Sequence, residues 1–156
     1  MKGPVVAGIV ALMLPFGQAA AAEFKLDSLV IGNPWARATP KGATIGGGYL
    51  DIKNNGTAPD RLLRGSVSVA KRFQIHGTTT EDGVAKMREI TAGVEIRPGE
   101  TIKFEPDASH FMFVNLMQPL HEGETVRGTL TFERAGVIEI EYAVAGVGAK
   151  APGGEP

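Results

Sequence analysis

The strongest constraint on the fold is a rhythm of short apolar or alternating runs, which turn residues interrupt about every ten residues after position 23. An amphipathic helix would instead show apolar residues at every third or fourth position. The interruptions have the composition of turns, as in Asn54–Gly56, Glu81–Gly83 and Arg97–Gly99. The pattern therefore predicts an all-β domain, either a β-sandwich or a barrel.

The segments that fit β-strands share a length of three to ten residues and a content of apolar or alternating side chains. They are Leu29–Ile31, Gly47–Lys53, Arg61–Val69, Arg72–His76, Ala85–Ile90, Thr101–Phe104, His110–Leu116, Thr125–Phe132 and Val137–Ala143. Polar residues alternate with apolar ones in the last two, which is typical of a sheet with one solvated face.

The first 22 residues predict a signal peptide. Lys2 precedes an uncharged apolar run, Val5–Phe16, and the small residues Ala19–Ala22 follow. This order is that of a secretory signal, with cleavage after Ala22. The run falls short of the roughly 20 residues that a membrane-spanning helix needs, so we expect an exported protein without a stable membrane anchor.

The rest of the chain divides into one domain and a tail. Residues 23–145 have the size of a single domain with its own core. Residues 146–156 contain too little apolar material to pack, so the composition predicts a disordered tail.

Composition excludes several classes of function. The chain has 16 basic and 17 acidic residues, a balance that offers no electrostatic footprint for nucleic acid. It has no Cys, and therefore no thiolate for catalysis or metal binding. Gly46–Gly48 precedes a strand and not a helix, so it is no dinucleotide-binding motif. With no local signature of a catalytic triad either, we expect that the protein is not an enzyme.

The soft ligands of the chain are crowded into one stretch. After the predicted signal peptide, every His and Met lies between residues 76 and 121. His110 and Met112 are two apart in a predicted strand and would point to the same face. His76 ends one predicted strand and Met87 lies in the next, so a hairpin could bring this second pair to the first.

Two imidazoles and two thioethers point to a particular metal. Thioethers suit Cu(I) and are poor ligands for Zn²⁺, Ca²⁺ or Mg²⁺. A blue-copper electron carrier needs a Cys thiolate, which this chain lacks. We therefore expect one Cu(I) per chain, held by His76, Met87, His110 and Met112.

Other interpretations of these residues stay open. Met112 alone would be a core residue, since Met commonly fills gaps, and His76 and His110 alone would be hydrogen-bonded strand residues. Met117 and His121 lie in a predicted loop and are left out of the site, and Trp35 either anchors an extended segment or shields the site. If the His and Met residues are incidental, the chain is a metal-free β-sandwich module of the cell envelope or of adhesion.

The spacing of the four residues resembles that of the periplasmic copper chaperones of the PCuAC family. Ten residues separate His76 from Met87 and 22 separate Met87 from His110, before His-x-Met completes the motif. The resemblance extends to Pro34–Pro40, Glu81–Gly83 and Met117–Leu120.

The resemblance implies a cupredoxin-like Greek-key β-sandwich, a periplasmic location and a monomer. It also implies that copper is delivered to respiratory oxidase assembly, either to the copper subunit of cytochrome c oxidase or to another assembly chaperone. Gly77 departs from relatives that have a further Met or acid after the first His. The tail lacks the His- and Met-rich extension that gives some relatives a second copper site.

Overall fold

The computed structural model describes residues 22–154, and these form an all-β domain. Its strands are β1 (Glu23–Leu26), β2 (Leu29–Arg37), β3 (Ile45–Asn54), β4 (Asp60–Val67), β5 (Ala70–Glu81), β6 (Val84–Glu89), β7 (Val94–Ile96), β8 (Thr101–Phe104), β9 (His110–Leu116), β10 (Thr125–Phe132) and β11 (Gly136–Ala145). The predicted fold class is confirmed. None of residues 22–154 belongs to a helix long and apolar enough to cross a membrane.

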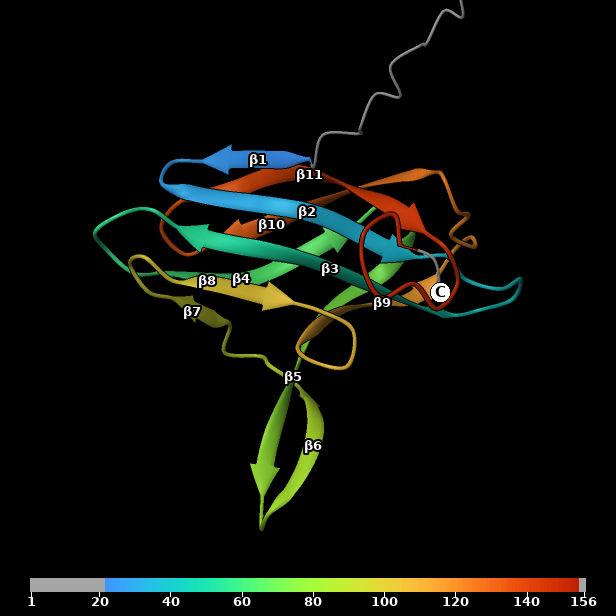
Figure 1. Ribbon diagram of the computed structural model, residues 1–156, viewed down its shortest axis with the longest axis horizontal. Coiled ribbons are helices and arrows are strands. Elements are labelled where there is room, and N and C mark those ends of the chain that lie inside the picture. Colours follow the sequence, from blue (N-terminus) through green and yellow to red (C-terminus); the bar gives the residue numbers. More distant parts are fainter. Residues whose placement is uncertain (1–21, 155–156) are drawn as a thin grey trace, which may run out of the picture.

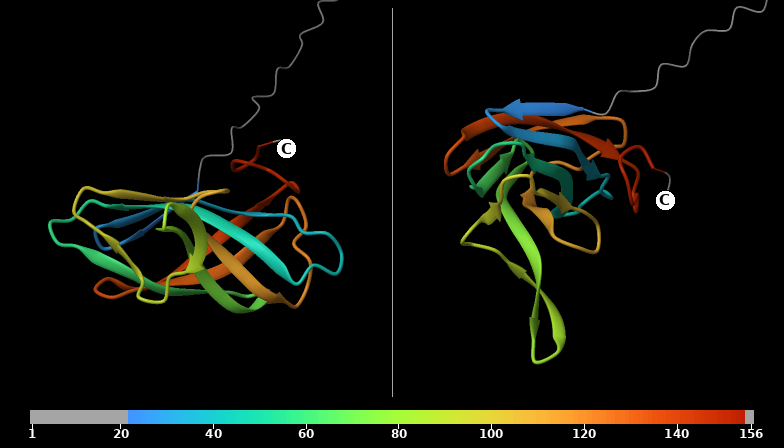
Figure 2. Two further views of the ribbon diagram at one scale, coloured as in Figure 1. Left: turned by 90° about the horizontal axis from the view of Figure 1, so that it is seen from below. Right: turned by 60° about the vertical axis from the view of Figure 1, so that its left-hand side comes forward.

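The strands form one continuous hydrogen-bonded path that curls over itself into two layers (Figures 1 and 2). The path runs β6-β5-β9-β3-β2-β11-β10-β4-β7, while β1 pairs with β2 and β8 with β3. Every pairing is antiparallel except that of β11 with β2. The β5–β6 hairpin begins this path and projects away from the body as an arm (Figure 1).

The core lies between the two layers and is built from inward-facing residues of both. Its largest fully buried side chains are Tyr142, Phe104, Phe111, Phe113, Phe132, Leu29, Ile31, Leu50, Ile52, Leu62, Ile96 and Leu120. Phe111 and Phe113 are successive inward residues of β9 and are 0% exposed. Burial on this scale supplies the main driving force for folding without disulfides.

Two departures from the predicted strands have simple causes. Strand β2 continues past Pro34 because the β2–β3 register shifts between Gly32 and Trp35, and proline is tolerated at such an irregularity. Asn33 adopts a positive φ of 51° at this point. Strands β1 and β7, with four and three residues, were not predicted because each is defined by its pairing with one neighbour, β2 for β1 and β4 for β7, which the sequence pattern does not show.

The sequence predicts a signal peptide at the N-terminal end of the chain and a disordered tail at the C-terminal end. Residues 1–21 of the expected signal peptide lie outside the described residues. The composition of the tail predicts that it does not pack, whereas Ala149 is fully buried against Trp35 and Tyr49. The Nε–H of Arg37 donates to the Ala149 carbonyl at 2.7 Å. One small side chain and one backbone acceptor thus hold a segment that is otherwise poor in apolar residues.

Candidate metal site

The candidate residues His76 and His110 lie directly opposite each other on β5 and β9. They are cross-strand partners, with ring centroids 5.7 Å apart and planes inclined by 31°. Met112 is two residues further along β9, opposite Gln74. Because side chains two apart share a face, His110 and Met112 lie together, as the alternation predicts. The structure therefore brings His76, His110 and Met112 to one patch of the sheet.

Met87 lies on the same face but outside this patch. It belongs to β6 and is opposite Thr78, two residues beyond His76 on β5. The position opposite Met87 is Thr78, four positions along β5 from Gln74, which is opposite Met112, or about 13 Å along the strand. The hairpin predicted from the sequence is present, yet its register places Met87 on the projecting arm.

Backbone and side-chain acceptors orient both imidazoles. The Nδ1 of His110 is 2.9 Å from the Ala108 carbonyl oxygen, which can only accept, so Nδ1 carries the proton and Nε2 keeps its lone pair. The Nε2 of His76 is 3.1 Å from Oε1 of Gln74. The Gln74 amide in turn donates from Nε2 to the Glu89 carboxylate at 3.0 Å.

Gln74 and Glu89 help to orient His76, and the sequence alone did not predict this role for them. Gln74 is two residues before His76, and the same period that pairs His110 with Met112 places it on the site face. Glu89 is the cross-strand partner of His76, which only the β5–β6 register shows. Such partners fix the orientation of a metal-binding imidazole.

The surroundings of His76 favour its neutral form. Partial burial lowers its pKa, the neighbouring His110 lowers it further, and Glu89 opposes the shift. A neutral imidazole is the form that binds a metal ion. His76 is therefore ready to act as a ligand at neutral pH.

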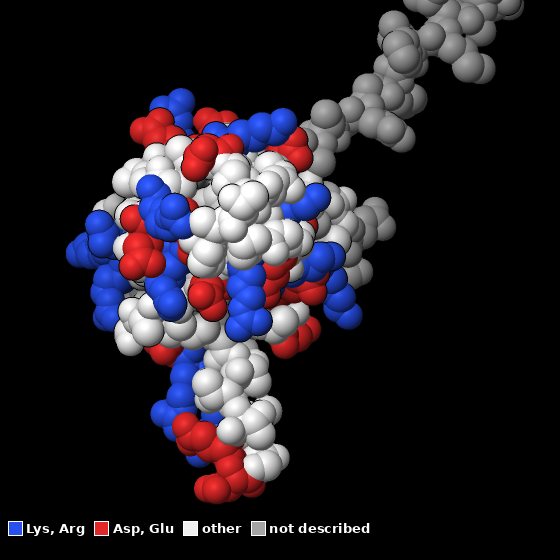
Figure 3. All heavy atoms as spheres, turned by 90° about the vertical axis from the view of Figure 1, so that its left-hand side faces the viewer, with Lys and Arg blue, Asp and Glu red and all other residues white. Residues whose placement is uncertain are grey.

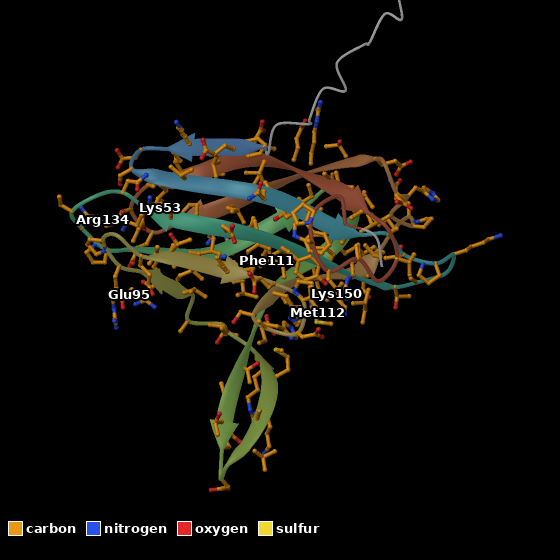
Figure 4. The ribbon with its side chains drawn as sticks, in the orientation of Figure 1. Lys53, Glu95, Phe111, Met112, Arg134 and Lys150 are labelled. Atoms are coloured by element: carbon orange, nitrogen blue, oxygen red, sulfur yellow. The ribbon has the colours of Figure 1, made fainter. Side chains whose placement is uncertain are left out.

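The patch is open to solvent on one side and backed by the core on the other. His76, His110 and Met112 are each partly exposed, and Met87 on the neighbouring arm is 43% exposed. Phe111 and Phe113, which alternate with the site residues along β9, are fully buried on the opposite face. Figure 4 shows Phe111 and Met112 where the arm leaves the body, far from Glu95 on β7. An open site of this kind suits a cargo that has to be exchanged.

The aromatic residues next to the patch form a separate cluster. Met112 is opposite Gly47 on β3, and a Cβ on Gly47 would be 2.6 Å from the hydroxyl of Tyr49. The Tyr49 ring packs on Trp35, with centroids 4.4 Å apart. Trp35 is 4% exposed and is the cross-strand partner of Tyr49, so both rings lie on the same face of the sheet as Met112, with β3 between Trp35 and β9.

The remaining soft ligands lie elsewhere. The backbone N–H of Met117 donates to Val69, at the opposite end of the β5–β9 ladder from His76. His121 is exposed in the loop before β10. Within residues 22–154, no group of three or more His, Cys, Asp or Glu side chains could hold a metal ion. The sulfur donor that the register places beside the two imidazoles is the thioether of Met112.

Comparisons with known proteins agree on the family and the fold. A family model described as "Putative lipoprotein LpqE-like" matches residues 29–144. The curated "Putative lipoprotein Lxx21020" of Leifsonia xyli subsp. xyli (strain CTCB07) is 32% identical over 106 residues, or 68% of this chain. The match spans 63% of the length of that relative.

Solved structures similar to this chain include two PCuAC domains. The copper-bound PCuAC domain from PmoF2 has a TM-score of 0.69 and 25% identity, covering 80% of this chain and 98% of the domain. The apo PCuAC domain from PmoF1 has a TM-score of 0.68 and 26% identity, with coverages of 80% and 99%. The solution structure of CuI-DR1885 from Deinococcus radiodurans has a TM-score of 0.62 and 23% identity, with coverages of 81% and 83%. These likenesses confirm the predicted cupredoxin-like fold and the resemblance to PCuAC domains.

Proposed function

This chain belongs to the LpqE-like family, and we propose that it is an exported copper-binding protein that holds one Cu(I) ion and passes it to a partner. The proposed ligands are His76, Met87, His110 and Met112. The similar copper-bound PCuAC domain from PmoF2 supports the choice of metal. The arrangement of this chain's own side chains supports it independently.

The observation that carries the proposal is the pairing of His76 with His110 beside the thioether of Met112. In each imidazole one ring nitrogen donates a hydrogen bond, Nε2 of His76 to Gln74 and Nδ1 of His110 to Ala108. The other ring nitrogen, Nδ1 of His76 and Nε2 of His110, is then the one that can bind the metal. A neutral donor set of nitrogen and thioether sulfur favours Cu(I) over hard divalent ions. The chain has no Cys, so a blue-copper electron-transfer site is ruled out for these residues.

A transport role follows from the openness of the site. The exposed Met87 and the solvent-facing patch would allow a second protein to approach the copper and replace its ligands one at a time. A respiratory oxidase copper subunit, or another assembly chaperone, is the proposed receiver, by analogy with the PCuAC family. No group in the patch is arranged for nucleophilic or acid–base catalysis, so the proposal is a carrier and not an enzyme.

The proposed location is the periplasm. The signal-like residues 1–22 and the lipoprotein descriptions of the family and the relative support export. The 156 residues contain no Cys to which a lipid could be attached.

The decisive test is anaerobic Cu(I) competition against a chromophoric chelator, with Met112→Leu and the matched control Met117→Leu. We expect one Cu(I) per wild-type chain. Met112→Leu should weaken binding at least about tenfold, because loss of even a supporting partner costs 10–100-fold at metal sites. Met117 is 60% exposed and away from the patch, so its variant should bind like wild type. No Cu(I) binding by wild type would favour the metal-free envelope module, and equal losses in both variants would show that the site is misplaced.

A further inference from the structure

We propose that the free part of the β5–β6 arm, residues 77–88, closes over the patch when copper binds and so carries Met87 to the metal. The proposal rests on the proposed function, because it concerns how the fourth ligand reaches the same ion. It adds a conformational step that the sequence motif does not contain.

The register of the strands shows why a movement is needed. Met112 is opposite Gln74 and Met87 is opposite Thr78, on strands that flank β5 on either side. The two methionines are thus about 13 Å apart along the strands and about 10 Å apart across them. Two sulfur ligands of one ion lie at most about 5 Å apart, given metal–sulfur distances near 2.3 Å. Neither methionine side chain is long enough to close this gap while the arm extends away from the body.

The arm is free to move because it has no second layer beneath it. The β5–β9 ladder ends at the His76–His110 pair, whereas β5 continues to Glu81. Strand β6 pairs with β5 alone, and all six of its residues are exposed. The right-hand view of Figure 2 shows the arm standing apart from the sandwich. Bending therefore sacrifices no core packing.

The hinge is placed at Gly77, the first residue beyond the ladder. Glycine loses no side-chain contacts when its backbone rotates and has the widest choice of φ and ψ. The side chain of Ile90 lies over Gly77, at 2.5 Å from where a Cβ would be. Gly77 is buried under Ile90 and is paired with Arg88, so Ile90 fixes the root of the arm and a bend at Gly77 moves both strands together.

The two faces of the arm differ in charge, and the uncharged one is on the side of the patch. Met87 shares its face with Thr78, Thr80 and Ala85. The opposite face has the ion pairs of Glu81 with Lys86 at 3.3 Å and with Arg88 at 2.7 Å. Figure 3 shows this division, with an uncharged side of the arm next to a charged one. Closure of residues 77–88 would therefore add no charge beside the imidazoles beyond that of Glu89, which already faces His76 at the root of the arm. Burying a further charge there would be costly.

The test uses the full chain with ¹³C-labelled methionine methyl groups, without metal and with one equivalent of Cu(I). Cu(I) has a closed d-shell and leaves the NMR spectrum sharp. We expect contacts between the Met87 methyl and the Met112 methyl or the His110 ring only in the copper form. The Met117 methyl is the internal control and should not shift. X-ray absorption should find two sulfur ligands in wild type and one in Met87→Leu, whose affinity should fall at least about tenfold.

The outcomes separate this inference from the proposed function. If copper binds with one sulfur ligand and the Met87 methyl does not move, closure is wrong and a three-ligand copper site remains. If the methyl contacts are already present without metal, the arm is closed from the start and the inference is also wrong. If the protein binds no Cu(I), the proposed function fails and closure fails with it.

Discussion

The substitution Gly48→Ala on β3 tests how tightly the core is packed around β9, the strand that contains His110 and Met112. Gly48 lies on β3 opposite Phe111, and a Cβ there would overlap the Cζ atom of Phe113. Phe113 is 0% exposed and packs edge-on against Tyr142, with centroids 5.4 Å apart, so it has little room to shift. Overpacking of this kind costs about 1–3 kcal/mol. Replacing glycine also lowers the conformational entropy of the unfolded chain, which stabilises the folded protein by about 0.4–1 kcal/mol.

We therefore expect Gly48→Ala to lower the free energy of unfolding by about 1–2 kcal/mol. For a domain of this size the midpoint of thermal unfolding should fall by roughly 4–8 °C. Denaturant unfolding followed by the fluorescence of the buried Trp35 measures the change. Gly32→Ala is the control, since the nearest atom to its Cβ would be Asp51 Cβ at 3.9 Å. Equal stability of the two variants would refute the packing argument.

The remaining predictions concern the imidazoles. Burial lowers the pKa of His76, so its protonation should compete with Cu(I) binding only in mildly acidic solution. As the pH falls through that range, the Cu(I) affinity should decrease by up to about tenfold per pH unit for each imidazole ligand. Competition titrations between about pH 5 and 8 should show a shallower slope for His76→Ala and an unchanged slope for Met87→Ala; the reverse would show that the imidazoles are not ligands. In the metal-free protein, ¹⁵N NMR should find the proton on Nε2 of His76 and on Nδ1 of His110. The same tautomer in both rings would contradict the hydrogen bonds to Gln74 and Ala108.

The fold could be predicted from the sequence wherever a strand has a clear period or a clear turn. The arm is an example: Asp82 and Gly83 have positive φ values of 51° and 78°, as a two-residue hairpin turn requires, and both residue types signal such a turn. The length of β5 beyond His76 could not be predicted, because Thr78–Glu81 gain their strand structure from pairing with β6 and have no apolar alternation.

The candidate site was predictable within one strand and much less so across strands. Alternation alone places His110 and Met112 on one face. The pairing of His76 with His110, and the outlying place of Met87, depend on registers that are set by the whole sheet. The same is true of Glu89, which reaches the site only through the β5–β6 pairing. Local sequence spacing cannot show which of two neighbouring residue pairs will be opposite each other.

Strand β9 links the site to the core, and this link divides the four proposed ligands into two kinds. His110 and Met112 alternate with Phe111 and Phe113, which are fully buried, so neither ligand can move without disturbing the core. Met87 has no such constraint, because its arm packs on nothing beyond its own hairpin within the described residues. Substitutions in the core of β9 should then alter how strongly copper is held, whereas changes in the arm that leave Met87 in place should alter how fast it is exchanged. A carrier needs both properties, and this fold assigns them to different parts of the same sheet.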